Sequence, residues 1–145
     1  MIVVSDSTPL IHLAKAGYMK LLFSLYKQVL ITGEVYREAI EEGIILEKED
    51  AVIIQKYIGN GINVKNPVSS SERLVEKYRI HKGEVDSIQL ANEIGAQLIL
   101  MNERDGRNAA KKEGFKVKGS IGVVFDALKA GLINEKEALE VLNKF

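Results

Sequence analysis

Acidic side chains follow a predicted strand or open a predicted helix at several separate places in this chain, and such residues can act together on a metal ion. Asp6 follows the apolar run at residues 2–4 after one serine, and Pro9 suits the first turn of a helix that begins there. The carboxyl end of a strand is where open α/β sheets bind ligands. The alternative is that Asp6 only caps the helix, but Ser7 or Thr8 could cap it instead. We therefore expect Asp6 to be functional.

A second acidic candidate, Glu38, lies in a helix predicted at residues 33–42. Val35 and Ala39 are four residues apart and share one face of this helix, and Glu38 lies at the edge of that face. Its side chain can therefore lean toward the protein interior. The alternative is that all the glutamates of this helix form a solvated face, and periodicity alone does not exclude it.

Two further acids, Glu84 and Asp86, stand in the first turn of a helix predicted at residues 83–95. Because they are two residues apart, they cannot share one helical face, so at most one of them points into a site that faces the sheet. Carboxylates in a first turn also complement the helix dipole, which is the simpler explanation of both.

A second apolar strand, predicted at residues 96–101, ends in the polar run at residues 102–107. It repeats the pattern seen at Asp6. Neighbouring strands of a parallel sheet share one carboxyl edge, so Asp6, Asn102 and Asp105 could converge there, and helices could bring the two glutamates to the same edge. Clustered carboxylates repel one another, so a cation would be part of the electrostatics of such a site.

The composition limits the classes of protein that fit. A chain of 145 residues with 46% hydrophobic residues is expected to form one domain over residues 1–145. The 20 basic and 20 acidic residues cancel, so any nucleic acid must be held locally. The absence of Cys excludes disulfides, thiolate metal sites and cysteine catalysis. No apolar run of 18 residues occurs, and we expect a cytoplasmic protein without membrane contact.

The elements that must position the acids alternate between strands and helices, which predicts an α/β fold. Strands are predicted at residues 2–4, 28–32, 62–64, 96–101 and 115–117. Helices are predicted at residues 9–17, 19–26, 33–42, 47–58, 72–78, 83–95, 108–113, 121–130 and 134–142. Gly43 is expected to end the third of these helices.

Several segments together resemble the PIN domain, although no single motif among them is specific. They are residues 3–17, Val35 to Glu38, Gly83-Glu84 with Leu90-Ala91, Leu98 to Asn102 with Arg104, Asp105 and Arg107, and Gly119 to Val123. The chain is most similar to a prokaryotic branch of uncharacterised PIN-like proteins that is related to the toxin nucleases of toxin–antitoxin pairs. The similarity runs from Ile2 to about Leu132, which is nearly the whole chain.

The resemblance implies a three-layer α/β/α sandwich around a mostly parallel sheet of four to five strands, and a ribonuclease site that depends on Mg²⁺ or Mn²⁺. The family's first three acids fall on Asp6, Glu38 and Glu84, and its fourth position falls on Asn102, with Asp105 as a further acid. These five residues are the implied metal ligands, and the four acids among them are the implied catalytic residues. Carboxylates and waters hold such hard cations, which neutralise the phosphate and activate water.

This chain departs from the family pattern at two of these positions. Where many relatives have Asp at the third position it has Glu84, a longer ligand of the same charge. Where close relatives often have paired Asp residues after the strand it has Asn102-Glu103. An amide oxygen can bind a hard cation, but it adds no charge.

The resemblance also implies a substrate and partners. The expected substrate is single-stranded RNA, the expected protein partner is an antitoxin, and the expected assembly is a homodimer. Ser7 or Thr8 could hold a water or a phosphate oxygen at the start of the following helix. Arg104 and Arg107 could contact the RNA backbone.

Two other classes of protein remain open. A phosphoaspartate enzyme also places Asp at the end of the first strand, but the haloacid-dehalogenase-like pattern needs a second Asp two residues later, where Thr8 stands. The stronger alternative is a catalytically weak or inactive PIN-fold module that binds nucleic acid or protein, because Asn102 weakens the fourth position.

Overall fold

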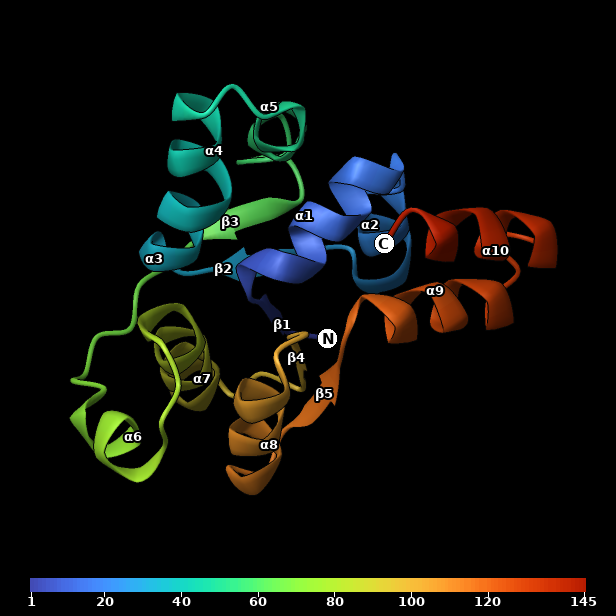
Figure 1. Cartoon of the computed structure of the whole chain (residues 1–145). Coiled ribbons are helices and arrows are strands. Elements are labelled where there is room, and N and C mark those ends of the chain that lie inside the picture. Colours follow the sequence, from blue (N-terminus) through green and yellow to red (C-terminus); the bar gives the residue numbers. More distant parts are fainter.

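Five parallel strands form the central sheet of the protein, which a computed structural model describes over residues 1–145 (Figure 1). The strands lie in the order β3-β2-β1-β4-β5, and every neighbouring pair is parallel. Their bounds are β1 (Val3–Ser5), β2 (Val29–Ile31), β3 (Ile62–Val64), β4 (Leu98–Leu100) and β5 (Lys116–Lys118).

Strand β1 is buried on both faces because it lies in the middle of the sheet. Val3 belongs to one apolar core together with Leu10 of the first helix. Val4, whose side chain points to the opposite face, belongs to a second core together with Ile88. The protein therefore has three layers, with helices on both faces of the sheet, as expected.

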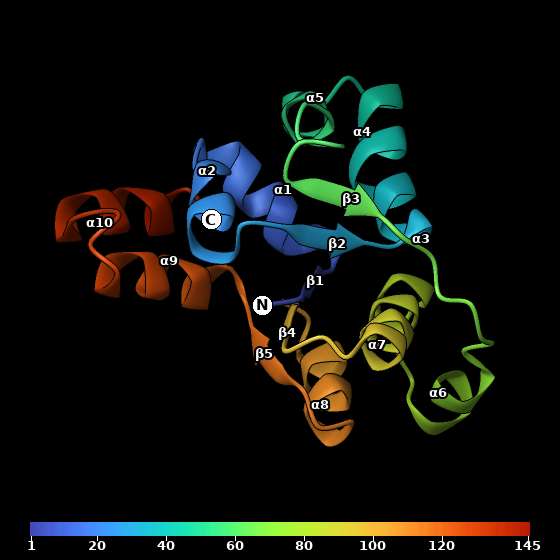
Figure 2. The ribbon, with the colours of Figure 1, turned by 180° about the vertical axis from the view of Figure 1, so that it is seen from behind.

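Most helices before β3 cover the first face together with α9, whereas α6, α7 and α8 cover the other (Figures 1 and 2). The first group is α1 (Ser7–Ala16), α2 (Lys20–Tyr26), α3 (Gly33–Tyr36), the π-helical segment η1 (Arg37–Glu41), α4 (Glu42–Ile45), α5 (Glu49–Gln55) and α9 (Ser120–Lys129). The second group is α6 (Glu72–Lys77), α7 (Lys82–Ile94) and α8 (Arg104–Lys112). Helix α10 (Glu135–Asn143) packs on α9. None of these helices is both long and apolar enough to span a membrane.

The strand order reverses between β1 and β4. From β1 the chain adds β2 and β3 on one side, and it then returns to add β4 and β5 on the other. Open α/β sheets bind ligands at such a reversal of strand order. The backbone N–H of Asp6 donates to the carbonyl oxygen of Leu100 at 2.8 Å, so Asp6 lies directly beside the end of β4.

The predicted end of a helix at Gly43 is wrong. Segments α3, η1 and α4 follow one another without a break as far as Ile45. Gly43 is buried within α4, and a Cβ at this position would lie 2.5 Å from the Cβ of Ala51 in α5. Because it has no side chain, this glycine lets α4 pack closely on α5. Its role is therefore in packing inside the helix and not in ending it.

The predicted start of a helix at residue 108 is also wrong. Helix α8 begins at Arg104, directly after the extended residue Glu103. The polar run after β4 is therefore mostly helical, and its Asp105 stands in a first turn, where a carboxylate is favoured by the helix dipole. Gly106 lies buried inside the helix.

Candidate functional site

The side chain of Asp6 is buried beside the carboxyl end of β4 without the partners that a capping residue would have. The residue has extended backbone angles at the N-cap of α1, yet its side chain makes no capping hydrogen bond. Only 1% of the residue is exposed, and its Oδ1 has no hydrogen-bond partner in the protein. Asp6 therefore does not act as a helix cap, which was the alternative explanation of its position.

Burial raises the pKa of Asp6 to about 7. The charges of Glu84 and Glu38 raise it further, whereas the backbone N–H of Ser7 and the charge of His81 act in the opposite direction. These four neighbours come from three different elements of the fold. The carboxyl edge beside β1 is thus an acidic cluster, defined here as Asp6, Glu38 and Glu84.

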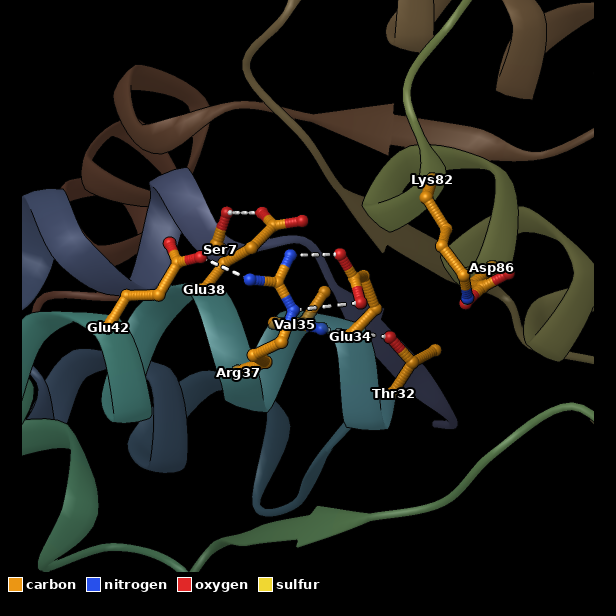
Figure 3. A network of polar contacts seen from close by, with 9 residues as sticks. All are labelled: Ser7, Thr32, Glu34, Val35, Arg37, Glu38, Glu42, Lys82 and Asp86. Atoms are coloured by element: carbon orange, nitrogen blue, oxygen red, sulfur yellow. Dashed lines mark hydrogen bonds and ion pairs between the residues drawn. The ribbon is translucent and has the colours of Figure 1, made fainter.

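Glu38 reaches the acidic cluster from the π-helical segment η1. Its Oε2 accepts a hydrogen bond of 3.1 Å from the Oγ of Ser7, so the carboxylate points toward the start of α1 (Figure 3). The side chain is half-buried, and burial raises its pKa. Short π-helical turns inside helices occur frequently at functional sites. The neighbouring Arg37 pairs with Glu34 and Glu42 instead of with Glu38 (Figure 3).

Glu84 enters the acidic cluster from the first turn of α7. Only 2% of it is exposed, and burial raises its pKa. Its Oε1 lies 3.0 Å from the Nε2 of His81 and accepts from the His81 backbone N–H, whereas its Oε2 has no partner. Asp86 instead pairs with Lys82 at 2.7 Å, outside the cluster. Of the two acids in this turn, Glu84 is the one beside Asp6.

Two glycines leave the space that these glutamates occupy. A Cβ on Gly83 would lie 2.6 Å from the Oε1 of Glu38, and a Cβ on Gly106 would lie 2.0 Å from the Oε2 of Glu84. Any side chain at either position would displace a carboxylate. The glycines of α7 and α8 are therefore part of the construction of the site.

Asn102 makes its hydrogen bonds with Ser120 and His12 and none with the acidic cluster. Its Oδ1 accepts from the backbone N–H of Ser120 at 2.8 Å, and its Nδ2 donates to the Ser120 Oγ at 2.9 Å. The same Nδ2 lies 3.1 Å from the Nδ1 of His12. Asn102 thus joins β4 to the start of α9. Asp105 is exposed in the first turn of α8, and its charge raises the pKa of Glu84.

The predicted substrate-binding residues lie on both sides of the acidic cluster. Ser7 is buried and uses its hydroxyl on Glu38, and Thr8 follows it in the first turn of α1. Arg104 is exposed on α8. Arg107 lies one turn later and donates from Nη1 to the carbonyl oxygen of Met101 at 3.2 Å.

His81 lies at the acidic cluster, although sequence reasoning gave it no role. It is the N-cap of α7, and its charge lowers the pKa of Asp6, Glu38 and Glu84. The signal that could have found it is the spacing of His81 and Glu84, three residues apart at the start of a helix, because side chains at this spacing are neighbours. This spacing would have placed the imidazole next to the carboxylate of Glu84.

The donor set at this edge suits a hard divalent cation. Three buried side-chain oxygens have no protein partner, the Oδ1 of Asp6, the Oε2 of Glu84 and the Oγ of Ser87 in α7, and buried polar atoms normally have partners. In the present side-chain positions no three Asp, Glu or His groups converge on one point as ligands of a single ion. The ligands would therefore have to move to close around a cation. The long side chains of Glu38 and Glu84 allow this movement by rotation about their χ angles.

A parallel sheet covered on both faces, with buried carboxylates at its switch point, defines a class of α/β domains that bind their ligands at this edge. Within this class, a family model described as a PIN domain matches residues 2–145, and the chain belongs to the PIN-domain family. The resemblance inferred from the sequence is thereby confirmed. PIN domains are generally nucleases and typically use divalent metals. No curated protein shows a significant match to the chain.

Proposed function

We propose that the protein is a metal-dependent ribonuclease that hydrolyses phosphodiester bonds of single-stranded RNA. The observation that carries this proposal is the carboxylate of Asp6, which is buried beside Glu38 and Glu84 and has an oxygen without a partner. Leaving a polar atom buried and unpaired costs about 1–3 kcal/mol, and more for a charged group. A bound cation would offset this cost, and family membership makes a nuclease the natural use of such a cation.

The acids of the cluster would divide the work between holding the cation and moving protons. Asp6 and Glu84 would hold Mg²⁺ or Mn²⁺, whose charge neutralises the phosphate and activates a water molecule. Glu38 is half-buried and fixed by Ser7, so it is placed to accept a proton from the attacking water. Asp105, exposed nearby, would add negative charge to the outer side of the site.

The remaining predicted residues would hold the RNA. Arg104 is exposed at the start of α8, two residues before the glycine that packs against Glu84, and would contact a phosphate. Arg107 and the first turn of α1, with Thr8, would contact neighbouring parts of the backbone. In this arrangement the scissile phosphate would be bound at the cation held by Asp6 and Glu84.

Cleavage of a labelled single-stranded RNA tests the proposal. We expect cleavage in Mn²⁺ or Mg²⁺, none in EDTA, and a loss on the order of a hundredfold or more in Asp6→Asn. Asp86→Asn is the matched control, because Asp86 lies in the same turn as Glu84 but pairs with Lys82. Cleavage that persists in EDTA or in Asp6→Asn would overturn the proposal.

A second candidate function is a PIN-fold module that binds RNA or protein without cleaving it. The observation that favours it is Asn102, whose amide is fully engaged by Ser120 and His12 and adds no charge to the cluster. In this case the protein would retain a labelled RNA in a binding assay, and no product would form in Mn²⁺.

The toxin role, the antitoxin partner, the homodimer and the cytoplasmic location are parts of the proposal that rest on the resemblance to toxin nucleases. A neighbouring open reading frame for a small antitoxin-like protein, which inhibits cleavage when it is added, would support the toxin role. Light scattering of the purified chain tests the homodimer.

A further inference from the structure

A groove of about 550 Å³ opens where β5 leads into α9. Strand β5 packs against both α8 and α9 (Figure 1). The groove is lined by Asn102, two residues after the Leu100 carbonyl that accepts from the Asp6 backbone N–H. It is also lined by Arg107, which directly follows the glycine that packs against Glu84. The groove therefore lies beside the acidic cluster, along the same edge of the sheet.

The charge of this groove that has no partner in the protein is positive. Its other two charged side chains, Lys118 and Asp126, pair with each other. Arg107 donates from Nη1 to the carbonyl oxygen of Met101, and its other guanidinium nitrogens have no protein partner. A Cβ on Gly119 would lie 2.8 Å from this Nη1, so the guanidinium lies against the backbone at the start of α9. The groove thus suits an anion such as a phosphate.

The groove also has an apolar strip on α9, made of Ile121 and Phe125. These residues are four apart and therefore share one face of the helix, and they are 56% and 50% exposed. Proteins that bind single-stranded nucleic acid combine an exposed aromatic ring, on which a base stacks, with a positive groove that follows the backbone. Phe125 and Arg107 provide both features in one groove.

We propose that this groove binds one nucleotide of the RNA substrate, with its base stacked on Phe125 and its phosphate held by Arg107. The inference rests on the proposed function for the class of ligand, and it adds a site for a base beside the acids. A base can stack on Phe125 only when it is unpaired and turned away from its neighbours. The groove would therefore select single-stranded over double-stranded RNA without reading a particular base, because every base has a face that can stack.

Fluorescence anisotropy of a labelled single-stranded RNA, with all variants made in Asp6→Asn protein and kept in EDTA, tests this contact without cleavage. We expect Phe125→Ala to bind about tenfold or more weakly, and Phe125→Trp, which keeps a stacking ring, to bind at least as tightly as the Asp6→Asn protein. Phe125→Leu keeps an apolar side chain without a ring, so it should bind like Phe125→Ala. The control is Leu139→Ala, because Leu139 is 62% exposed on α10 and does not line the groove. It should leave the affinity unchanged.

RNAs that each lack one base at a different position, but keep every phosphate, test the stacking directly. At one position the missing base should weaken binding to the Asp6→Asn protein and have no further effect in Phe125→Ala. Equal effects of every missing base in the two proteins, or unchanged binding in Phe125→Ala, would overturn the inference and leave the proposed nuclease intact.

Two further outcomes separate this inference from its alternatives. If Phe125→Ala binds RNA unchanged but alters the mass measured by light scattering, the apolar strip is a contact between copies of the chain, and the inference is wrong. If binding depends on Phe125 but the parent chain does not cleave RNA in Mn²⁺, the groove is supported and the nuclease is contradicted.

Discussion

At the scale of single residues, the carboxylates of the acidic cluster are buried close together, and a bound cation would reduce the electrostatic cost of this burial. Burial is the largest cause of the raised pKa of Asp6, of Glu38 and of Glu84. The same burial would strengthen the attraction of these carboxylates for a positive ion, because charges interact more strongly where water is excluded. The residues that destabilise the metal-free protein are therefore those expected to bind the metal.

We predict that the stability of the metal-free protein falls as the pH rises from about 4 to about 7. The pKa of Asp6 is about 7 in the folded protein and 3.8 without perturbation, so the folded state binds more protons over this interval. This shift corresponds to roughly 4 kcal/mol in the free energy of unfolding. Urea unfolding in EDTA at several pH values should show the fall in the parent chain and a much smaller one in Asp6→Asn.

Asp86→Asn is the control for this measurement, since Asp86 pairs with Lys82. It should keep the pH dependence of the parent chain. If the parent chain and Asp6→Asn had the same pH dependence, the pKa of Asp6 would not be raised in the folded protein. The effect attributed to its burial would then be wrong.

We predict that Mn²⁺ raises the melting temperature of the parent chain. A ligand that binds only the folded state at about 100 times its Kd adds about 2.7 kcal/mol, which corresponds to about 5–10 °C for a chain of this size. Asp6→Asn should lose most of this gain. In EDTA the same variant should melt above the parent chain at neutral pH, because the charge repulsion within the cluster is relieved. A melting temperature that does not respond to millimolar Mn²⁺ would contradict the metal site.

At the scale of elements, the site depends on how closely α8 packs against α7. Gly106 lies inside α8, where a Cβ would meet both the Oε2 of Glu84 and the Sδ of Met101, the latter at 2.6 Å. Both atoms are the ends of buried side chains, so a new Cβ at Gly106 would force them to move against their own buried neighbours. The position of the Glu84 carboxylate is thus fixed by a glycine in a different helix.

We predict that Gly106→Ala weakens Mn²⁺ binding about tenfold, because the new methyl group displaces the Glu84 carboxylate. Gly122→Ala is the matched control, since Gly122 is also a glycine inside a helix and its Cβ would lie 3.3 Å from the Cβ of Lys118. Alanine favours both helices equally, by about 1 kcal/mol. Calorimetry should therefore show a loss of Mn²⁺ affinity in Gly106→Ala alone, and equal affinities in the two variants would refute the packing role of Gly106.

The sequence predicted most elements of the fold because their signals are local. An apolar strand followed by an acid identified both β1 with Asp6 and the end of β4. The helix end at Gly43 was predicted wrongly because a buried glycine inside a helix has the same local appearance as a glycine that ends one. Gly106, which is likewise buried inside α8, hid the start of that helix at Arg104. The π-helical turn around Glu38 has no local signal in this sequence, so the inward direction of Glu38 depended on the resemblance.

At the scale of the whole molecule, the site joins segments that are far apart in the chain. The Asn102 amide meets Ser120 and His12, which are 18 and 90 residues away. Such contacts depend on the strand order, which one sequence does not determine. For the same reason the bonding of the Asn102 amide to Ser120 and His12 could not be predicted, whereas Asp6 could be placed from its own strand.

The balanced charge of the chain makes a further prediction about RNA binding. The 20 basic and 20 acidic residues leave no overall positive field, so the affinity should depend on a few local cations such as Arg104 and Arg107. Each phosphate contact on a single strand contributes about −0.7 to the slope of log K against log salt concentration, so two contacts predict a slope of about −1.4. Fluorescence anisotropy of a labelled single-stranded RNA, with Asp6→Asn protein in EDTA, measures this slope without cleavage.

Arg104→Gln in the Asp6→Asn background should reduce the slope by about 0.7, since it removes one phosphate contact. Lys136→Gln is the control, because Lys136 is exposed on α10, which packs on α9 and away from α8 (Figure 1). It should leave the slope unchanged. A slope steeper than about −4, or equal effects of the two substitutions, would show that RNA is held by a broad basic surface, and the local binding inferred from the balanced charge would then be wrong.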